Sequence, residues 1–220
     1  MVATKSFVAS TLVALVFVVA TPALADEPTV KINDADQAWA ARALLRSSDF
    51  GMGWRGGMTT PTKLEDPSCP GFDPKLSDIV ITGHANASFK NPRAGVQVSL
   101  DTQVLESPEA VRADFERTIR PPLADCLEHQ FRQGPSNFVS VEVQPLDFPQ
   151  VGSSTAAYRA TILVRNNGRT AKVLSDFVFI GHGRLEYSIN VVAPARYRPQ
   201  LVPFEADMAR ILVKRGARPE

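Results

Sequence analysis

Polar and apolar residues alternate strictly over several segments of this chain. From Leu185 to Val191 every second residue is apolar, and Glu186, Ser188 and Asn190 stand between them. The segments 79–89, 96–101 and 139–143 show the same period, which predicts that Ile79 to Phe89 present their odd-numbered side chains on one face. Period two places successive side chains on opposite faces of a strand. A sheet with one packed face and one wetter face is typical of antiparallel pairing.

Three other regions predict helices that would cover the packed face. Asn33 or Asp34 is a plausible N-cap for a first helix, and Ser107-Pro108 begins a second, which the pair Pro121-Pro122 interrupts. A third has apolar residues at helical spacing from Leu201 to Leu212. The acids of the middle region, including Asp114, are predicted to form a solvated face. The resulting order, α-ββ-α-ββββ-α, predicts an α+β fold with a single antiparallel sheet of about six strands packed by helices.

The first 25 residues predict a secretory signal peptide. Lys5 is their only charged residue, an apolar run occupies positions 7–20, and the leader ends in Ala-Leu-Ala. The run is short for a membrane span of about 20 residues, so an uncleaved anchor is the second interpretation. We therefore expect four parts: a signal peptide at 1–25, a flexible N-terminal arm at 26–35, a single α+β domain at 36–215, and a tail at 216–220.

Charge narrows the choice of partners. The chain has 24 Lys and Arg residues and 23 Asp and Glu residues, and Lys5 would be lost with the leader. Neutralising phosphates requires a clustered excess of basic residues, so we expect no nucleic acid as a bulk partner. We expect a secreted, extracytoplasmic protein of the cell envelope that has no stable membrane anchor after cleavage.

Two cysteines in a secreted chain predict one disulfide, Cys69–Cys126. His129 lies three residues from Cys126, so a metal site and a catalytic Cys/His pair are the alternatives. Helical phasing places Cys126 at the edge of an apolar face and His129 on the polar side, which disfavours both. We predict no catalytic, metal-binding or cofactor-binding residues, and we expect His84, His129 and His182 to be exposed to solvent.

A long segment at 47–75, rich in Gly, Pro, Ser and Thr, predicts an irregular loop that is functional or tethered. It contains "GMGWRG", which satisfies the G-x-G-x-x-G pattern. That motif binds dinucleotides only between a strand and a helix, and here it follows a helix. The glycines instead predict a flexible loop around a tryptophan that either anchors the core or covers a ligand. The candidate ligand loop consists of Gly51, Gly53, Trp54, Gly56 and Gly57.

The segment "AARALL…SDFGMGW", the loop "SCPGF", the helix ending "LADCL" and the later strands together resemble a known family. The arrangement, over about 36–215, resembles secreted actinobacterial domains related to the extracellular sensor domains of mycobacterial serine/threonine kinases. The resemblance implies an antiparallel sheet packed by helices, with disulfides and a cleft that binds an extracytoplasmic ligand. That family usually has two disulfides, whereas this chain can form one. No kinase domain is present, so neither kinase signalling nor any ligand-binding residue carries over.

The leading functional expectation is a secreted, non-enzymatic domain that binds a ligand or a partner at the cell envelope, in the manner of a sensor. Its site would lie between sheet and helices, near the candidate ligand loop. One alternative is a secreted hydrolase in which a carboxylate and a histidine, such as His84 or His182, meet in a cleft. The other is a purely structural envelope protein.

Overall fold

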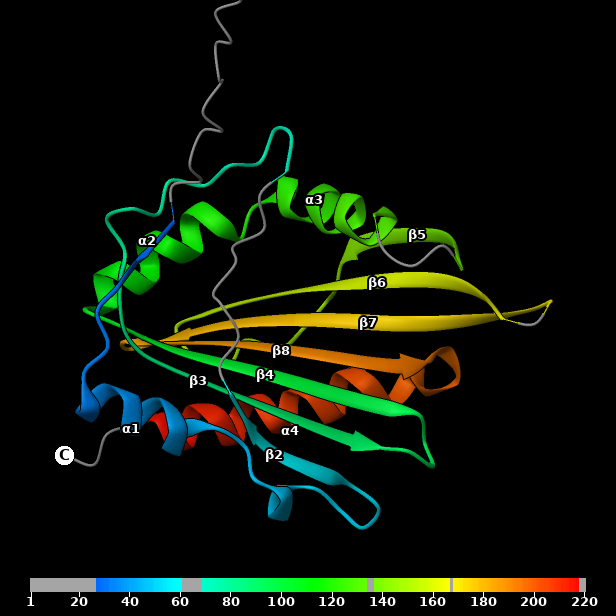
Figure 1. Cartoon of the computed structure of the whole chain (residues 1–220), viewed down its shortest axis with the longest axis horizontal. Helices are drawn as coiled ribbons and strands as arrows, with labels where there is room; N and C mark the ends of the chain where they lie inside the picture. The colour runs from blue at the N-terminus through cyan, green and yellow to red at the C-terminus, as the bar shows by residue number, and fades with distance from the viewer. Residues whose placement is uncertain (1–26, 61–68, 134–136, 167, 218–220) are drawn as a thin grey trace, which may run out of the picture.

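The computed structural model describes residues 27–60, 69–133, 137–166 and 168–217. The predicted signal peptide and the last three residues of the predicted tail lie outside these ranges. Four helices and eight strands form an α+β fold (Figure 1). The helices are α1 Asp34–Ala43, α2 Pro108–Thr118, α3 Pro121–Arg132 and α4 Arg198–Gly216. The strands are β1 Thr29–Val30, β2 Arg55–Thr59, β3 Val80–Asn91, β4 Val96–Leu105, β5 Phe138–Pro145, β6 Ser154–Asn166, β7 Arg169–His182 and β8 Leu185–Pro194.

The α+β class is confirmed, but the sheet is larger than predicted and is not purely antiparallel. The strand order is β1-β3-β4-β8-β7-β6-β5, with β2 also paired to β3. β1 comes from the segment predicted as an N-terminal arm, and it runs parallel to β3. β2 comes from the segment predicted as an irregular loop. Both strands are too short, or too rich in glycine, to show a period of two.

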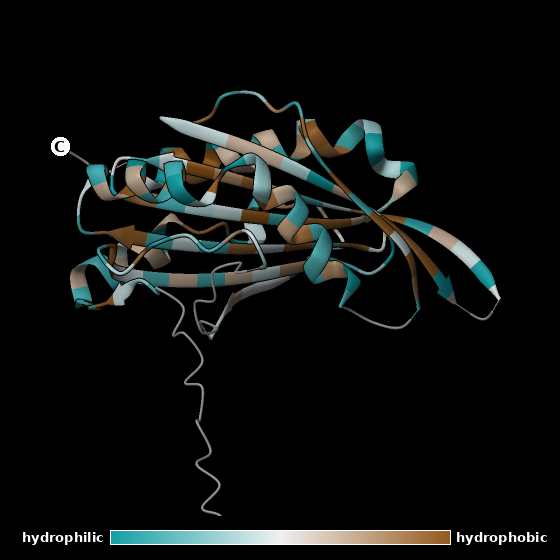
Figure 2. Ribbon diagram, turned by 90° about the horizontal axis from the view of Figure 1, so that it is seen from above, coloured by the Kyte–Doolittle hydropathy of each residue, from teal (hydrophilic) through white to brown (hydrophobic). Residues whose placement is uncertain are grey.

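Helices cover both faces of the sheet, whereas the sequence predicted only one covered face. α1 and α4 pack on the face that carries Val98, Tyr187 and Val178, and this layer holds the main core. α3 packs on the opposite face over β5 and β6, where Tyr158 and Ile162 are buried. Figure 2 shows hydrophobic and hydrophilic bands alternating along the strands. We call the second face, opposite α1 and α4, the open face.

A bulge in β3 explains why one predicted face is wrong. Ile81 pairs with Leu105 while Gly83 pairs with Val104, so Thr82 is an extra residue in β3. An extra residue turns the following side chains to the other face. Ile81 therefore packs with Leu105 beneath α2 on the open face. Ala85, Ala87 and Phe89 instead join the core beneath α1 and α4.

The carboxylate of Asp36 ties α1 to this bulge. It accepts hydrogen bonds from the Thr82 hydroxyl at 2.7 Å and from the Arg184 guanidinium at 2.6 Å. Burial alone would raise the pKa of Asp36, but the hydrogen bonds from Asn33, Arg184 and Thr82 hold it below its ordinary value. α1 also lies very close to the sheet here, because a Cβ on Gly83 would come within 2.4 Å of the Asp36 carbonyl oxygen.

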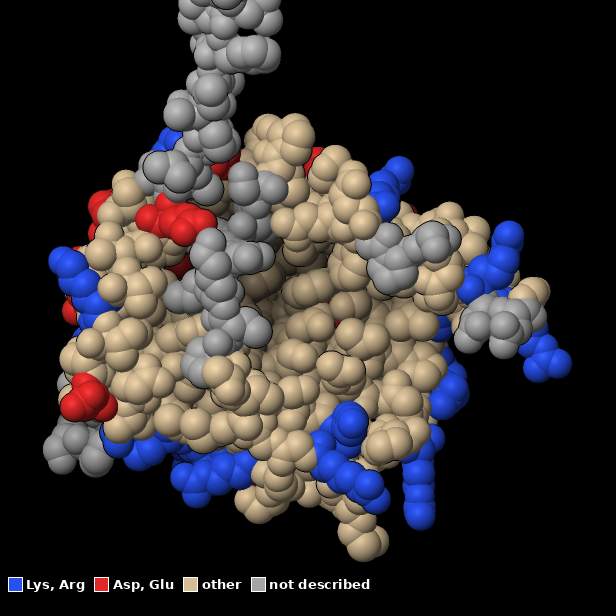
Figure 3. Space-filling model, viewed as in Figure 1, with Lys and Arg blue, Asp and Glu red and all other residues tan. Residues whose placement is uncertain are grey.

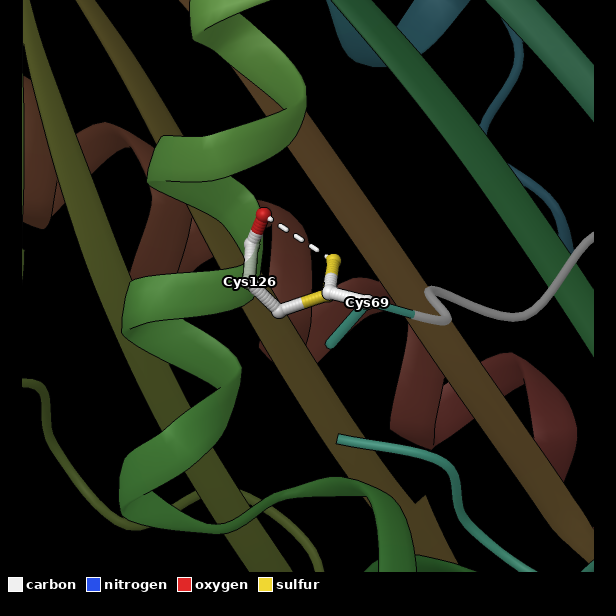
Figure 4. The surroundings of a disulfide bond; sticks show 2 residues. All are labelled: Cys69 and Cys126. Carbon is white, nitrogen blue, oxygen red and sulfur yellow. Dashed lines mark hydrogen bonds between the residues drawn. A yellow bond between two sulfur atoms is a disulfide. The ribbon is translucent and has the colours of Figure 1, made fainter. Parts of the chain in front are cut away.

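The predicted disulfide is present. Cys69 and Cys126 are joined by an S–S bond of 1.98 Å, with Cα atoms 5.5 Å apart (Figure 4). Cys126 is buried in α3 among Leu123, Leu127 and the open-face residues of β5 and β6. The bond therefore holds the short turn between Cys69 and Phe72 against the helix layer of the open face.

A buried charged cluster joins α4 to β6 and β7. The Arg159 guanidinium donates hydrogen bonds of 2.6 and 2.5 Å to the two carboxylate oxygens of Asp176. Glu205, on α4, is fully buried next to Asp176. Burial and the neighbouring Asp176 carboxylate raise the pKa of Glu205 from its ordinary 4.5 to about 9. Glu205 therefore keeps its proton at neutral pH.

Replacing Cys69 and Cys126 by serine should lower the free energy of unfolding by roughly 4 kcal/mol. A cross-link of this span removes about that much entropy from the unfolded chain. Urea unfolding at equilibrium measures the change. The oxidised parent should unfold at higher urea than both the reduced parent and Cys69→Ser/Cys126→Ser, and the last two should coincide. Equal midpoints for the oxidised and reduced parent would contradict this.

Glu205→Gln should flatten the dependence of stability on pH. The unfolded chain releases the Glu205 proton above pH 4.5, whereas the folded chain holds it until about pH 9. This group therefore costs stability progressively as the pH rises between those values. Melting temperatures measured from pH 5 to pH 9 should fall more steeply for the parent than for Glu205→Gln. Asp207→Asn, which alters an exposed acid on the same helix, is the matched control and should keep the parental slope.

Candidate functional site

The central part of the open face is polar. The register places one polar row across β3, β4 and β8, formed by His84, Gln103 and Glu186. A second row consists of Asn86, Asp101 and Ser188. Together these six residues are called the floor. Apart from the buried His84, each is half-buried.

Figure 3 shows this face and a hollow in its middle. α2 packs over one end of the strands, since a Cβ on Gly181 would lie 2.9 Å from Val111. α3 covers β5 and β6 at the side. The floor lies on the strands between these two helices. A hollow with fixed walls and a few polar groups is the usual form of a small-molecule site.

His84 is the most deeply buried polar group of the floor. Its Nε2 lies 2.5 Å from the Asp101 carboxylate, which also accepts a 2.7 Å hydrogen bond from the Asn86 amide. Only 6% of the surface of His84 is exposed, so the prediction that it faces solvent is wrong. Buried polar groups need partners, and Asp101 supplies one. His129 is exposed as predicted, and His182 is half-buried.

A second carboxyl group enters the site from α2. Burial raises the pKa of Asp114, and its side chain shares a hydrogen bond with that of Glu186. Two carboxyl groups can share a hydrogen bond only when one of them holds a proton. The prediction that Asp114 belongs to a solvated helix face is therefore wrong. Its side chain points to the sheet because α2 packs over β7 and β8 at this position.

The opposite side of the open face is aromatic. Phe177 and Phe179 lie on β7, next to Asn190 and Ser188 of β8, and both are half-buried. Phe131 of α3 meets Phe177 edge-on, with ring centroids 5.9 Å apart, and Tyr158 meets Phe179 at 6.4 Å. We call Phe177 and Phe179 the aromatic side. The open face thus changes from carboxylates and amides on β3 and β4 to aromatic rings on β7.

The candidate ligand loop lies elsewhere, on the side of the sheet that α4 covers. The Trp54 ring stacks on Phe204 of α4, with centroids 5.7 Å apart, and it contacts Phe50 at 4.8 Å. Gly56 approaches β3 so closely that a Cβ would lie 2.0 Å from the Ser88 carbonyl oxygen. A Cβ on Gly51 or Gly57 would have no described atom within 4 Å, and Gly53 has a positive φ of 91°. Trp54 therefore packs on the α4 side of the sheet, whereas Gly56 and Gly57 lie in β2, the strand beside β3.

Strand alternation contained the signal for the floor, since Asp101, Glu186 and Ser188 all fall in the polar sets of their strands. It could not show that these sets come together between two helices. The buried Glu205 was also missed. Its position, four residues after Leu201 and three before Met208, was the available signal.

The described residues contain no group of three or more His, Cys, Asp or Glu side chains arranged to hold a metal ion. Within the same residues, no helix is long and apolar enough to cross a membrane. Comparison of the chain with known proteins finds no matching family and no matching curated protein.

Proposed function

We propose that this protein is a non-enzymatic, sensor-like domain of the cell envelope that binds a small organic ligand in the hollow of the open face. The observation that carries the proposal is the floor, a set of polar side chains that lies between α2 and α3 and is half-buried apart from His84. Carboxylate and amide groups can each make more than one hydrogen bond, so a ligand with matching groups can bind beside the contacts that the floor residues already make.

The chemistry of the hollow limits the ligand. The floor offers carboxylate and amide oxygens as acceptors, and none of its residues is Lys or Arg. Acceptors of this kind suit hydroxyl or ammonium donors and repel anionic groups. The aromatic side offers ring surface to an apolar part of the same molecule. The proposal is therefore a neutral or cationic, amphipathic ligand. The disulfide supports placement outside the cytoplasm, where such bonds persist.

Blocking the hollow should abolish binding. Ser188→Phe puts a ring in the middle of the floor, and Ser140→Phe puts the same ring on an exposed edge strand. Cell-envelope extract, alkyl glycosides or alkylamines should raise the melting temperature of the parent and of Ser140→Phe but not that of Ser188→Phe. Differential scanning fluorimetry measures these melting temperatures. No shift with any of these additions, or an equal shift in both variants, would contradict the proposal.

A second candidate function is hydrolysis, and the His84–Asp101–Asn86 chain favours it. A carboxylate that orients an imidazole is the arrangement of a general base. His84 would take a proton from water, whose oxygen attacks an ester carbonyl carbon. The carbon–oxygen bond to the alcohol then breaks, and the proton passes from His84 to the leaving oxygen. No step needs a group beyond water and the ester.

Hydrolysis of 4-nitrophenyl acetate distinguishes the two functions. If His84 acts as a base, His84→Ala should lower the rate by about 10²- to 10⁴-fold. Asp101→Asn should also lower it, because the ring loses its orienting carboxylate. His129→Ala removes an exposed histidine and should leave the rate unchanged. A parental rate no higher than that of His84→Ala excludes this role.

A further inference from the structure

Several turns meet at one end of the sheet. Asn91 pairs with Val96, so the β3–β4 turn lies at the end where β4 begins. The chain leaves β8 at that same end, because Gln97 of β4 pairs with Val192. The β6–β7 hairpin also turns there, since Val173 pairs with Pro194. Segments that lie more than 100 residues apart in the sequence thus share one edge.

The described segments that form this end are basic and contain no acid. The segments 90–97, 163–173 and 192–199, and β2 beside them, hold no Asp or Glu at all. Their basic residues are all exposed, and none has an acidic partner among the described residues. We call this set the basic rim. It consists of Arg55, Lys90, Arg93, Arg165, Arg169, Lys172, Arg196 and Arg198.

The opposite end of the sheet carries acids. Asp78 precedes β3, Glu106 follows β4, and Glu109 lies in the first turn of α2. Figure 3 shows blue side chains at the right and along the lower edge, and red ones mostly at the left, where blue side chains also lie. The chain as a whole has a net charge of only +1. Arg117 pairs with Asp78 and Arg112 pairs with Glu109 at that end, whereas no described acid pairs with the basic rim.

Part of the rim projects beyond the body. β5 pairs with β6 only as far as Val164, and β8 pairs with β7 only from Val173 onward. Beyond Arg165, whose amide donates to the Asn137 carbonyl, the β6–β7 hairpin is a two-stranded ribbon that pairs with no other described strand, visible as a hydrophilic extension in Figure 2. Arg165 and Lys172 face one side of this ribbon and Arg169 faces the other. A partner on one side would meet only some of these cations, whereas a partner at the tip meets all three.

We propose that the basic rim docks edge-on to an anionic phospholipid surface. The rim extends over six adjacent strands, from β2 to β6, which at about 4.8 Å per strand is about 24 Å. It forms an edge and not a cleft, so it fits an extended plane of negative charge. Each basic residue near such a surface strengthens association about fivefold, and eight of them suffice for reversible binding without an anchor. The rim does not overlap the floor, so this contact is independent of the proposed ligand site.

Single-stranded nucleic acid fits the rim less well, because its binding sites interleave cations with aromatic rings that stack on bases. Tyr197 is the one aromatic residue in the four segments, and the Arg196 guanidinium already lies over its ring, 4.8 Å from the centroid. We therefore commit to the lipid surface and treat a soluble polyanion as an outcome of the test.

Co-sedimentation of the full chain with vesicles tests the proposal. Vesicles of 40% phosphatidylglycerol in phosphatidylcholine should sediment the protein, and pure phosphatidylcholine should not. Arg165→Gln/Arg169→Gln/Lys172→Gln and Arg93→Gln/Arg196→Gln/Arg198→Gln should each weaken binding about tenfold or more. Lys31→Gln/Arg42→Gln/Lys214→Gln removes three exposed cations outside the rim and should bind like the parent. Circular dichroism should show all three variants folded.

Three results would overturn the proposal. The first is no sedimentation with phosphatidylglycerol vesicles at 50 mM salt, where screening is weak. The second is an equal loss of binding in all three triple variants, which would trace binding to net charge and not to the rim. The third is binding to heparin or single-stranded DNA without binding to vesicles, which would assign the rim to a soluble polyanion. Blocking the hollow with Ser188→Phe should not affect vesicle binding, so this test and the ligand test fail separately.

Discussion

The Asp36 carboxylate holds together parts of the chain that otherwise have no reason to meet. It accepts hydrogen bonds from α1's own cap residue, Asn33, from Thr82 in the β3 bulge, and from Arg184 in the β7–β8 turn. Arg184 in turn donates to the carbonyl of Leu105 at the end of β4. Hydrogen bonds to a buried charge are among the stronger polar contacts in proteins. This one fixes the bulge, and the bulge decides which face of the sheet each half of β3 presents.

The bulge has consequences on both faces. Before it, Ile81 supports α2 on the open face; after it, His84 and Asn86 lie on that face and form the polar floor. α2 and the floor are therefore fixed by the same irregularity in one strand. The disulfide acts on the other wall, where it holds the turn at Cys69 against α3. The hollow is built from rigid parts, which favours a pre-formed site over one that must fold around its ligand.

Local patterns predicted the helices, most strands and the disulfide, because capping residues, period two and the number of cysteines each act over a few residues. They failed where a single residue changes the phase, as Thr82 does, and where short glycine-rich strands such as β2 pair only because β3 is there. The sequence predicted only part of the floor. Alternation put Asp101 and Glu186 on polar sides of strands, but only the strand order brings them beside His84. The sensor-like role and the resemblance to kinase sensor domains remain proposals.

The strand axes run toward the basic rim, whereas the hollow opens through the open face of the sheet. If the rim binds a surface, the strands would therefore lie roughly perpendicular to that surface, and the opening of the hollow would remain accessible. A ligand moving along that surface would then meet the opening from the side. One small domain can in this way separate the surface that decides where it resides from the surface that decides what it detects.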